Sequence, residues 1–256
     1  MPGRQYVLHE ANYRQLLDRR PEVAVLPWGA TEAHNYHLPH GTDVIEATEL
    51  AERAAALADA RGAKVVVLPT IPFGNNAQQL DQVATVSIRT STAAAILDDV
   101  CHSLVKQGID RLVVLNAHGG NDFKPLVRDA QERHRMLIVV ANFFQMCPQL
   151  LAQVFDEPGD HAGEMETSFL LHVRPQWVSM EQAGEGTRAP FAVEGLDQSG
   201  VWTPRPWSAS HPDTGSGNPA KASAEKGRKY VDAVAEAIAK VVVGLSNAQK
   251  GQSPYL

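Results

Sequence analysis

Residues 23–43 of the chain read VAVLPWGATEAHNYHLPHGTD, and this stretch decides the fold. It opens on a continuous apolar run, residues 23–26, and passes directly into a loop crowded with histidines and carboxylates. A run without polar alternation is typical of a strand that is buried on both faces, as in a parallel sheet. In open α/β sheets, ligands bind where the strands deliver their C-terminal ends. The stretch therefore predicts a parallel sheet with its chemistry at one edge.

Three more apolar runs of the same kind follow along the chain, at residues 64–68, 111–115 and 136–141. Helix-like segments lie between or after these runs, at residues 43–62, 91–108, 122–135 and 222–245. The first two of these segments close on a glycine, which is a frequent stop at the C-terminus of a helix. The alternation of strand and helix predicts an α/β/α sandwich around a mostly parallel sheet.

The length of 256 residues favours a single domain, since α/β folds of this size commonly form one unit. Residues 184–219 differ in composition, with many Gly, Pro and Ser residues together with Trp202 and Trp207. A structureless stretch this long inside a compact domain is usually a lid or a binding loop. We therefore expect one domain over residues 1–256 that carries a long functional loop, rather than two domains joined by a linker.

Composition excludes several classes of function. The net charge of -6 argues against a nucleic-acid surface, which needs clustered positive charge. Cys101 and Cys147 form no CxxC pattern, so two reduced thiols are expected. The first 20 residues contain no apolar signal region, and no stretch approaches the roughly 20 apolar residues that span a bilayer. These features predict a cytoplasmic protein without a membrane partner.

The loop after the first apolar run carries candidate metal ligands. Glu32 and His34 are two residues apart, so both side chains point to the same side of an extended chain. Asp43 follows at the start of the next helix, and His37 and His40 lie between. Imidazole combined with carboxylate suits Zn, Mn or Fe, whereas Mg or Ca prefers oxygen ligands alone. A polar loop with surface histidines is the alternative at this point.

Two further clusters follow strand and turn signals later in the chain. His118 comes directly after the third apolar run, and Gly119 and Gly120 behind it allow a backbone to approach a ligand closely. The segment 160–168, DHAGEMETS, holds His161, Glu164 and Glu166. A histidine beside carboxylates can serve as a general acid or base. A helix N-terminus with favourable acidic residues in its first turn explains the same segment without any chemistry.

Taken in order, these motifs resemble the creatininase family. Its members carry E-x-H followed by HLP and TD, then N-x-H-G-G-N, and then H-A-G-x-x-E-T-S. The chain matches them at residues 32–34, 37–39, 42–43, 116–121 and 161–168, with a weaker match at 217–227. The resemblance spans nearly the whole chain, and it implies the creatininase-like α/β/α fold.

The resemblance also implies roles for individual residues. It suggests one metal site that consists of Glu32, Asp43 and His118. It suggests that His34 is part of a second site, with Asp43 as the ligand that bridges the two. Creatininase itself adds a glutamate two residues after the strand-end histidine, where this chain has Gly120. We expect Glu166 to replace that ligand, with Glu164 as the runner-up. His161 matches the proton-transferring histidine of the family, with Asp160 or Glu164 as the group that orients it.

The same departure bears on the substrate. True creatininases carry a Tyr-Glu pair where this chain has Gly119 and Gly120, so creatinine is a poor candidate. The Gly-Gly form is more similar to branches of the family that hydrolyse formamides or peptide-like amides. Candidates for the wall of the substrate pocket are Asn75, Asn76, Gly119, Gly120, Trp202 and Trp207, although core packing is an equal alternative for the tryptophans.

The sequence thus predicts a metal-dependent amidohydrolase that acts on the C–N bond of a small cyclic amide, a formamide or a peptide-like amide. Two divalent ions per subunit, Zn or Mn with Fe as an option, would activate a water molecule. A metal-dependent lactonase or esterase and a non-catalytic, Rossmann-like metal-binding module remain the alternatives. The family resemblance further implies a homohexamer.

Overall fold

A four-stranded parallel sheet forms the centre of the computed structural model, which describes residues 3–249 and 255. Its strands occur in the order β2–β1–β3–β4: β2 (Val65–Val67), β1 (Val23–Trp28), β3 (Arg111–Asn116) and β4 (Leu137–Asn142). The two central strands, β1 and β3, are buried along their whole length. In their register Trp28 pairs with Asn116, so both strands end at the same level and their following loops begin side by side.

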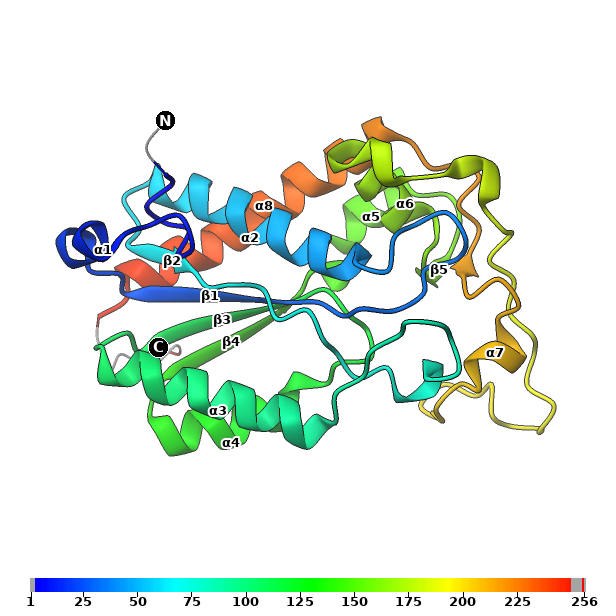
Figure 1. The fold of residues 1–256 in the computed structure, drawn as a ribbon, viewed down its shortest axis with the longest axis horizontal. Coiled ribbons are helices and arrows are strands. Elements are labelled where there is room, and N and C mark those ends of the chain that lie inside the picture. The colour runs from blue at the N-terminus through cyan, green and yellow to red at the C-terminus, as the bar shows by residue number, and fades with distance from the viewer. Residues whose placement is uncertain (1–2, 250–254, 256) are drawn as a thin grey trace.

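Helices cover both faces of this sheet (Figure 1). On one face lie α2 (Thr42–Asp59) and α8 (Ala224–Asn247), and on the other lie α3 (Thr90–Lys106) and α4 (Phe123–His134). The buried face of α2 is largely alanine, which lets α8 and the sheet approach it closely. The predicted α/β/α sandwich around a parallel sheet is confirmed, and its strands and long helices begin and end within a few residues of the predicted bounds.

The shorter elements gather mostly beyond the C-terminal ends of the strands (Figure 1). A two-stranded antiparallel ribbon joins β5 (Gly159–His161) to β6 (Ser216–Gly217), and α6 (Glu164–Val173) leads back to pack on α8. The remaining elements are α1 (Tyr13–Arg19), η1 (Ala77–Gln79), η2 (Phe143–Gln145), α5 (Pro148–Val154), η3 (Pro175–Trp177), η4 (Met180–Gln182) and α7 (Trp207–Ser210).

The segment DHAGEMETS, residues 160–168, contains the N-terminus of a helix, which is one of the two interpretations of its acidic residues. Gly163 is the N-cap of α6, and Glu164 and Glu166 occupy its first turn, where the helix dipole favours acidic residues. The long loop keeps only α7 and β6 as regular structure, as its composition predicts. Within residues 3–249, no helix is long and apolar enough to cross a membrane.

Candidate metal centre

The loop between β1 and α2 brings Glu32, His34 and Asp43 into one buried group. Its course is fixed by a bond from the Glu32 N–H to the His40 carbonyl and by a left-handed turn at Asn35. Gly29 is essential to this path, since a Cβ there would lie 2.7 Å from the backbone carbon of Asp43. The end of β1 therefore packs directly on the first turn of α2, and all three acidic or imidazole side chains are buried.

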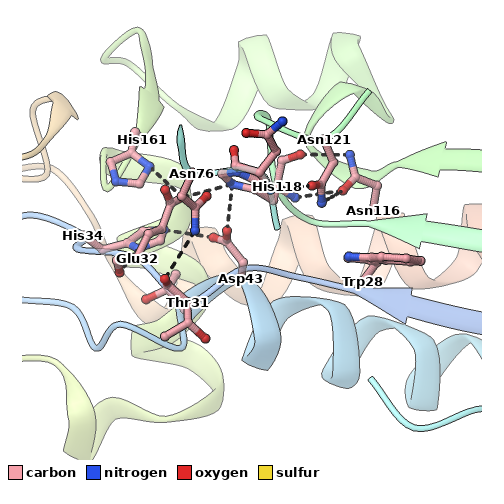
Figure 2. A network of polar contacts seen from close by, with 12 residues as sticks. Trp28, Thr31, Glu32, His34, Asp43, Asn76, Asn116, His118, Asn121 and His161 are labelled. Carbon is pink, nitrogen blue, oxygen red and sulfur yellow. Dashed lines mark hydrogen bonds and ion pairs between the residues drawn. The ribbon is translucent and has the colours of Figure 1, made fainter. Parts of the chain in front are cut away.

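His118 joins this group from the end of β3 (Figure 2). Its Nδ1 lies 3.0 Å from Glu32 Oε1 and 3.1 Å from Asp43 Oδ2. The other Asp43 oxygen, Oδ1, lies 2.9 Å from His34 Nε2. Asp43 thus uses one carboxylate oxygen toward each of two histidines, which is the arrangement expected of a ligand that bridges two ions.

Each histidine of the cluster has its second ring nitrogen against a backbone carbonyl. His34 Nδ1 lies 3.1 Å from the Glu32 carbonyl oxygen, His118 Nε2 lies 3.2 Å from that of Asn75, and His161 Nε2 lies 2.7 Å from that of Ala33. A carbonyl only accepts hydrogen bonds, so these nitrogens carry the proton in a neutral ring. A metal ion between the rings and the carboxylates would then meet a lone pair on each opposite nitrogen, as is usual for metal-binding histidines.

The ligand atoms fall into three overlapping groups that could each hold an ion. They are Glu32, Asp43 and His118; His34, Asp43 and Glu166; and Glu32, His34 and His161. Within each group the ligand atoms lie within 4.8 Å of one another, and every residue is buried. The first two groups are the two sets that the family resemblance implies, with Glu166 in the place left by Gly120. The third places His161 closer to ligand geometry than the sequence indicates.

Electrostatics of the protein groups alone support a cation at this place. Burial opposes charging of His34, but the nearby Asp43 carboxylate outweighs this effect and raises the pKa of His34 to about 10. Burial also opposes charging of His118, and there Glu32 and Asp43 raise the pKa well above its usual range. Burial likewise opposes ionisation of Glu32, yet the positive charge of His118 lowers its pKa. Several negative charges are therefore stabilised by positive charge in a site without solvent. Divalent metal ions supply such charge more effectively than protonated imidazoles.

His161 differs from the other two histidines. Burial and the positive charge of His34 lower its pKa to about 4, so its ring is neutral near pH 7. Its Nδ1 lies 3.7 Å from Glu32 Oε1, and its ring stands edge-on to Trp207 with centroids 5.1 Å apart. Trp207 in turn stacks on His211 at 4.1 Å. The predicted residue Trp207 is thus buried at the site, where it packs against one side of the His161 ring.

Glu46 is a residue that motif reasoning missed. It lies one turn after Asp43 on α2, is fully buried, and neither carboxylate oxygen has a hydrogen-bond partner among the described residues. Burial, followed by the charges of Glu166 and Asp43, raises its pKa well above the usual range. Glu166 is affected similarly, since burial raises its pKa to about 7. A glutamate on an otherwise alanine-rich helix face, three residues after Asp43, was the available signal.

Two predicted residues do not join the cluster. The Glu164 carboxylate accepts hydrogen bonds from the Asp156 and Glu157 N–H groups, at 2.8 Å each, and pairs with Lys226. It therefore joins the start of α6 to α8 and lies outside all three ligand groups. Trp202 is 80% exposed on the long loop and contributes no wall to the buried centre.

The predicted glycines and asparagines lie around His118. The Asn75 carbonyl holds the His118 ring, while the Asn75 side chain turns away to Thr90. A Cβ at Gly120 would lie 2.4 Å from both His118 Nε2 and the Asn75 carbonyl oxygen. Any side chain at this position would displace that contact. Gly119 by contrast faces open space.

Comparisons of the sequence with known proteins point to one family. Residues 8–242 match the family model described as Creatininase: creatinine amidohydrolase. A mycofactocin precursor peptide peptidase of Mycobacterium tuberculosis is 30% identical over 239 residues, which are 90% of this chain and 87% of that protein.

Solved structures show the same architecture. A Bacteroides fragilis protein named for creatinine amidohydrolase superposes with a TM-score of 0.89 at 37% identity, over 96% of this chain and 98% of that one. A creatininase variant of the zinc–zinc type superposes with a TM-score of 0.78 at 22% identity, over 96% of this chain and 100% of that one. The second likeness bears on the fold alone.

Proposed function

The chain belongs to the creatininase family and is a metal-dependent amidohydrolase of that family, and from this premise we propose its reaction. The substrate is a small cyclic amide, a formamide or a peptide-like amide, and two divalent ions, Zn or Mn, occupy the centre. The observation that carries the proposal is the pair of buried ligand groups that share Asp43.

The residues present fit two such ions. Glu32 with His118 would hold one ion and His34 with Glu166 the other, with Asp43 between them. Glu32 Oε2 is buried without a polar partner in the described part of the chain, and Glu32 Oε1 and Asp43 Oδ2 face only histidine ring nitrogens, as expected of atoms that serve a cation. When bound, the two ions would supply a water of lowered pKa and polarise the substrate carbonyl.

The protein groups then position and protonate the substrate. His161 is neutral and anchored through its Nε2–H to the Ala33 carbonyl, so its free Nδ1 can take a proton and return it to the leaving nitrogen. Trp207 covers the ring from one side and keeps water from it. General acid–base help of this kind contributes typically about 10² to 10⁴ in rate.

The test combines metal analysis with a matched substrate screen. Protein loaded with Zn or Mn is assayed against formanilide, 2-pyrrolidinone, hydantoin, a dipeptide amide and γ-butyrolactone. We expect two equivalents of metal and hydrolysis of at least one amide, which a chelator abolishes and added metal restores. Asp81→Asn, an exposed change outside the site, should behave as wild type. Hydrolysis of the lactone without any amide would establish an esterase instead, and full metal content without hydrolysis would favour a binding module.

We also propose a cytoplasmic homohexamer. The family resemblance supports the hexamer, and the two unpaired thiols, Cys101 and Cys147, suit a reducing compartment. Light scattering after size exclusion tests the assembly, and any mass other than about six times the 27.8 kDa of the chain would contradict it.

A further inference from the structure

The loop before η1 is pinned against the metal centre at several points. The Asn75 carbonyl holds the His118 ring, and the Asn76 N–H donates to Ser87 Oγ at 2.9 Å. The Asn76 side-chain amide donates a hydrogen bond to the carbonyl of Thr31, the residue directly before Glu32. In the view of Figure 2, Asn76 lies between the rings of His161 and His118. Asn76 is therefore part of the wall of the centre, although it is no candidate ligand.

The orientation of the Asn76 amide follows from its neighbours. Its Nδ2 lies 3.3 Å from the Thr31 carbonyl oxygen and 3.0 Å from that of Val86. Both partners are acceptors, so the nitrogen must face them and the oxygen must face the other way. That oxygen, Oδ1, is buried and has no hydrogen-bond partner among residues 3–249. An acceptor left in this state destabilises the fold, so it calls for an explanation such as a ligand that supplies the missing donor.

A second amide oxygen accompanies it. Gln79 is buried one turn further on, and its Oε1 also lacks a partner within the described chain. Its backbone N–H donates to the Asn76 carbonyl at 2.9 Å. The η1 segment that contains Gln79 packs against α7, whose Trp207 contacts His161. Two neutral acceptors without a partner among residues 3–249 thus lie one turn apart in this segment.

We propose that Asn76 Oδ1 accepts a hydrogen bond from an N–H group of the substrate. This rests on the proposed amidohydrolase function and narrows its substrate to amides that carry an N–H beside the reacting carbonyl. An ester or lactone oxygen would place a lone pair against Asn76 Oδ1 and leave that acceptor unpaired. Sites built to bond an N–H reject analogues that lack it far more strongly than apolar pockets reject shape variants.

A pair of metal-binding probes tests this role without knowledge of the substrate. Acetohydroxamic acid binds metal through its two oxygens and carries an N–H, whereas N-methylacetohydroxamic acid lacks it. Calorimetry on the metal-loaded protein should give a dissociation constant at least tenfold lower for the first probe. Metal content is measured in each sample, so the readout does not depend on turnover.

Three variants separate hydrogen bonding from steric fit. Asn76→Leu keeps the bulk and removes the acceptor, so binding of acetohydroxamic acid should weaken about tenfold while the N-methyl probe is unaffected. If the preference survives in Asn76→Leu and disappears only in Asn76→Ala, the discrimination is steric and the proposal fails. Asp81→Asn, on the same loop but exposed, should keep the wild-type ratio.

The wild-type protein alone can also overturn the proposal, even if the Asn76 variants do not fold. Equal affinity for the two probes would show that no N–H is recognised, while the amidohydrolase function would stand. Binding of neither probe to fully metal-loaded protein would instead count against a reachable two-metal centre, and the proposed function would fall with it.

Discussion

Asp43 holds the two halves of the centre together because its two carboxylate oxygens face different histidines. We predict that Asp43→Ala removes both ions, whereas Glu32→Ala weakens mainly one, since Glu32 belongs to the His118 group and not to the Glu166 group. Elemental analysis after gel filtration measures the occupancy. Retention of two equivalents in Asp43→Ala would rule out the bridging role.

Two glutamates of one helical turn have opposite roles in the structure. Glu166 faces His34 and Asp43, whereas Glu164 pairs with Lys226. Glu166→Gln should therefore lower the metal content to about one equivalent, and Glu164→Gln should leave it near two. Weakening the hydrogen bonds that the buried Glu164 carboxylate accepts should instead lower the stability of Glu164→Gln, by roughly 1–3 kcal/mol. Metal content and urea unfolding distinguish the two variants, and the reverse pattern would reassign the ligand.

His161 can be tested as a proton carrier through the leaving group. His161→Ala should keep the fold and both ions and lose roughly 10² or more in rate on an amide with a poor leaving group. An amide whose leaving group needs no proton should escape part of that loss. Unchanged turnover of the poor leaving group would exclude the acid role, and loss of metal would make His161 a ligand, as its group with Glu32 and His34 allows.

Among the elements, the tight packing at Gly120 makes a sharp prediction. A methyl group there would collide with the Asn75 carbonyl and with His118, so Gly120→Ala should turn the His118 ring and weaken metal binding at least tenfold. Gly41 lies in open space before α2, and Gly41→Ala serves as its control. Metal titration of both proteins gives the comparison. Equal affinities would mean that the loop shifts aside without affecting the ring.

The structural elements differ in how clearly the sequence predicts them. The buried strands and the long helices are evident because continuous apolar runs and helical segments repeat over many residues. The two predicted ligand sets rest on the family resemblance that the motifs carry, and the structure brings both sets together as groups that could hold an ion. Glu46 was missed because one carboxylate on an alanine-rich helix face is a weak signal, and Glu166, its other charged neighbour besides Asp43, comes from a distant segment. Glu164 and Glu166 could not be told apart by spacing, since the difference depends on where α8 places Lys226.

For the molecule as a whole, the centre should act as a fold stabiliser. Glu32, Asp43, Glu46 and Glu166 bring carboxylates into a small buried volume, where a divalent ion relieves their repulsion. A ligand at about 100 times its dissociation constant adds roughly 2.7 kcal/mol, which for this size corresponds to about 5–10 °C in Tm. Chelation should lower Tm by that amount and added Zn or Mn should restore it. In Asp43→Ala the chelator should have no effect, and a stable Tm in the wild type would contradict the prediction.

The carbonyl contacts that fix the three imidazole rings have a consequence for how this protein can change over generations. Every residue has a main-chain carbonyl, so replacing the side chain of Ala33 or Asn75 leaves the contact to His161 or His118 in place. The loops that select a substrate can therefore diverge in sequence while the imidazole rings keep their orientation. New specificities become reachable by single substitutions, without a passage through variants that have lost the ions.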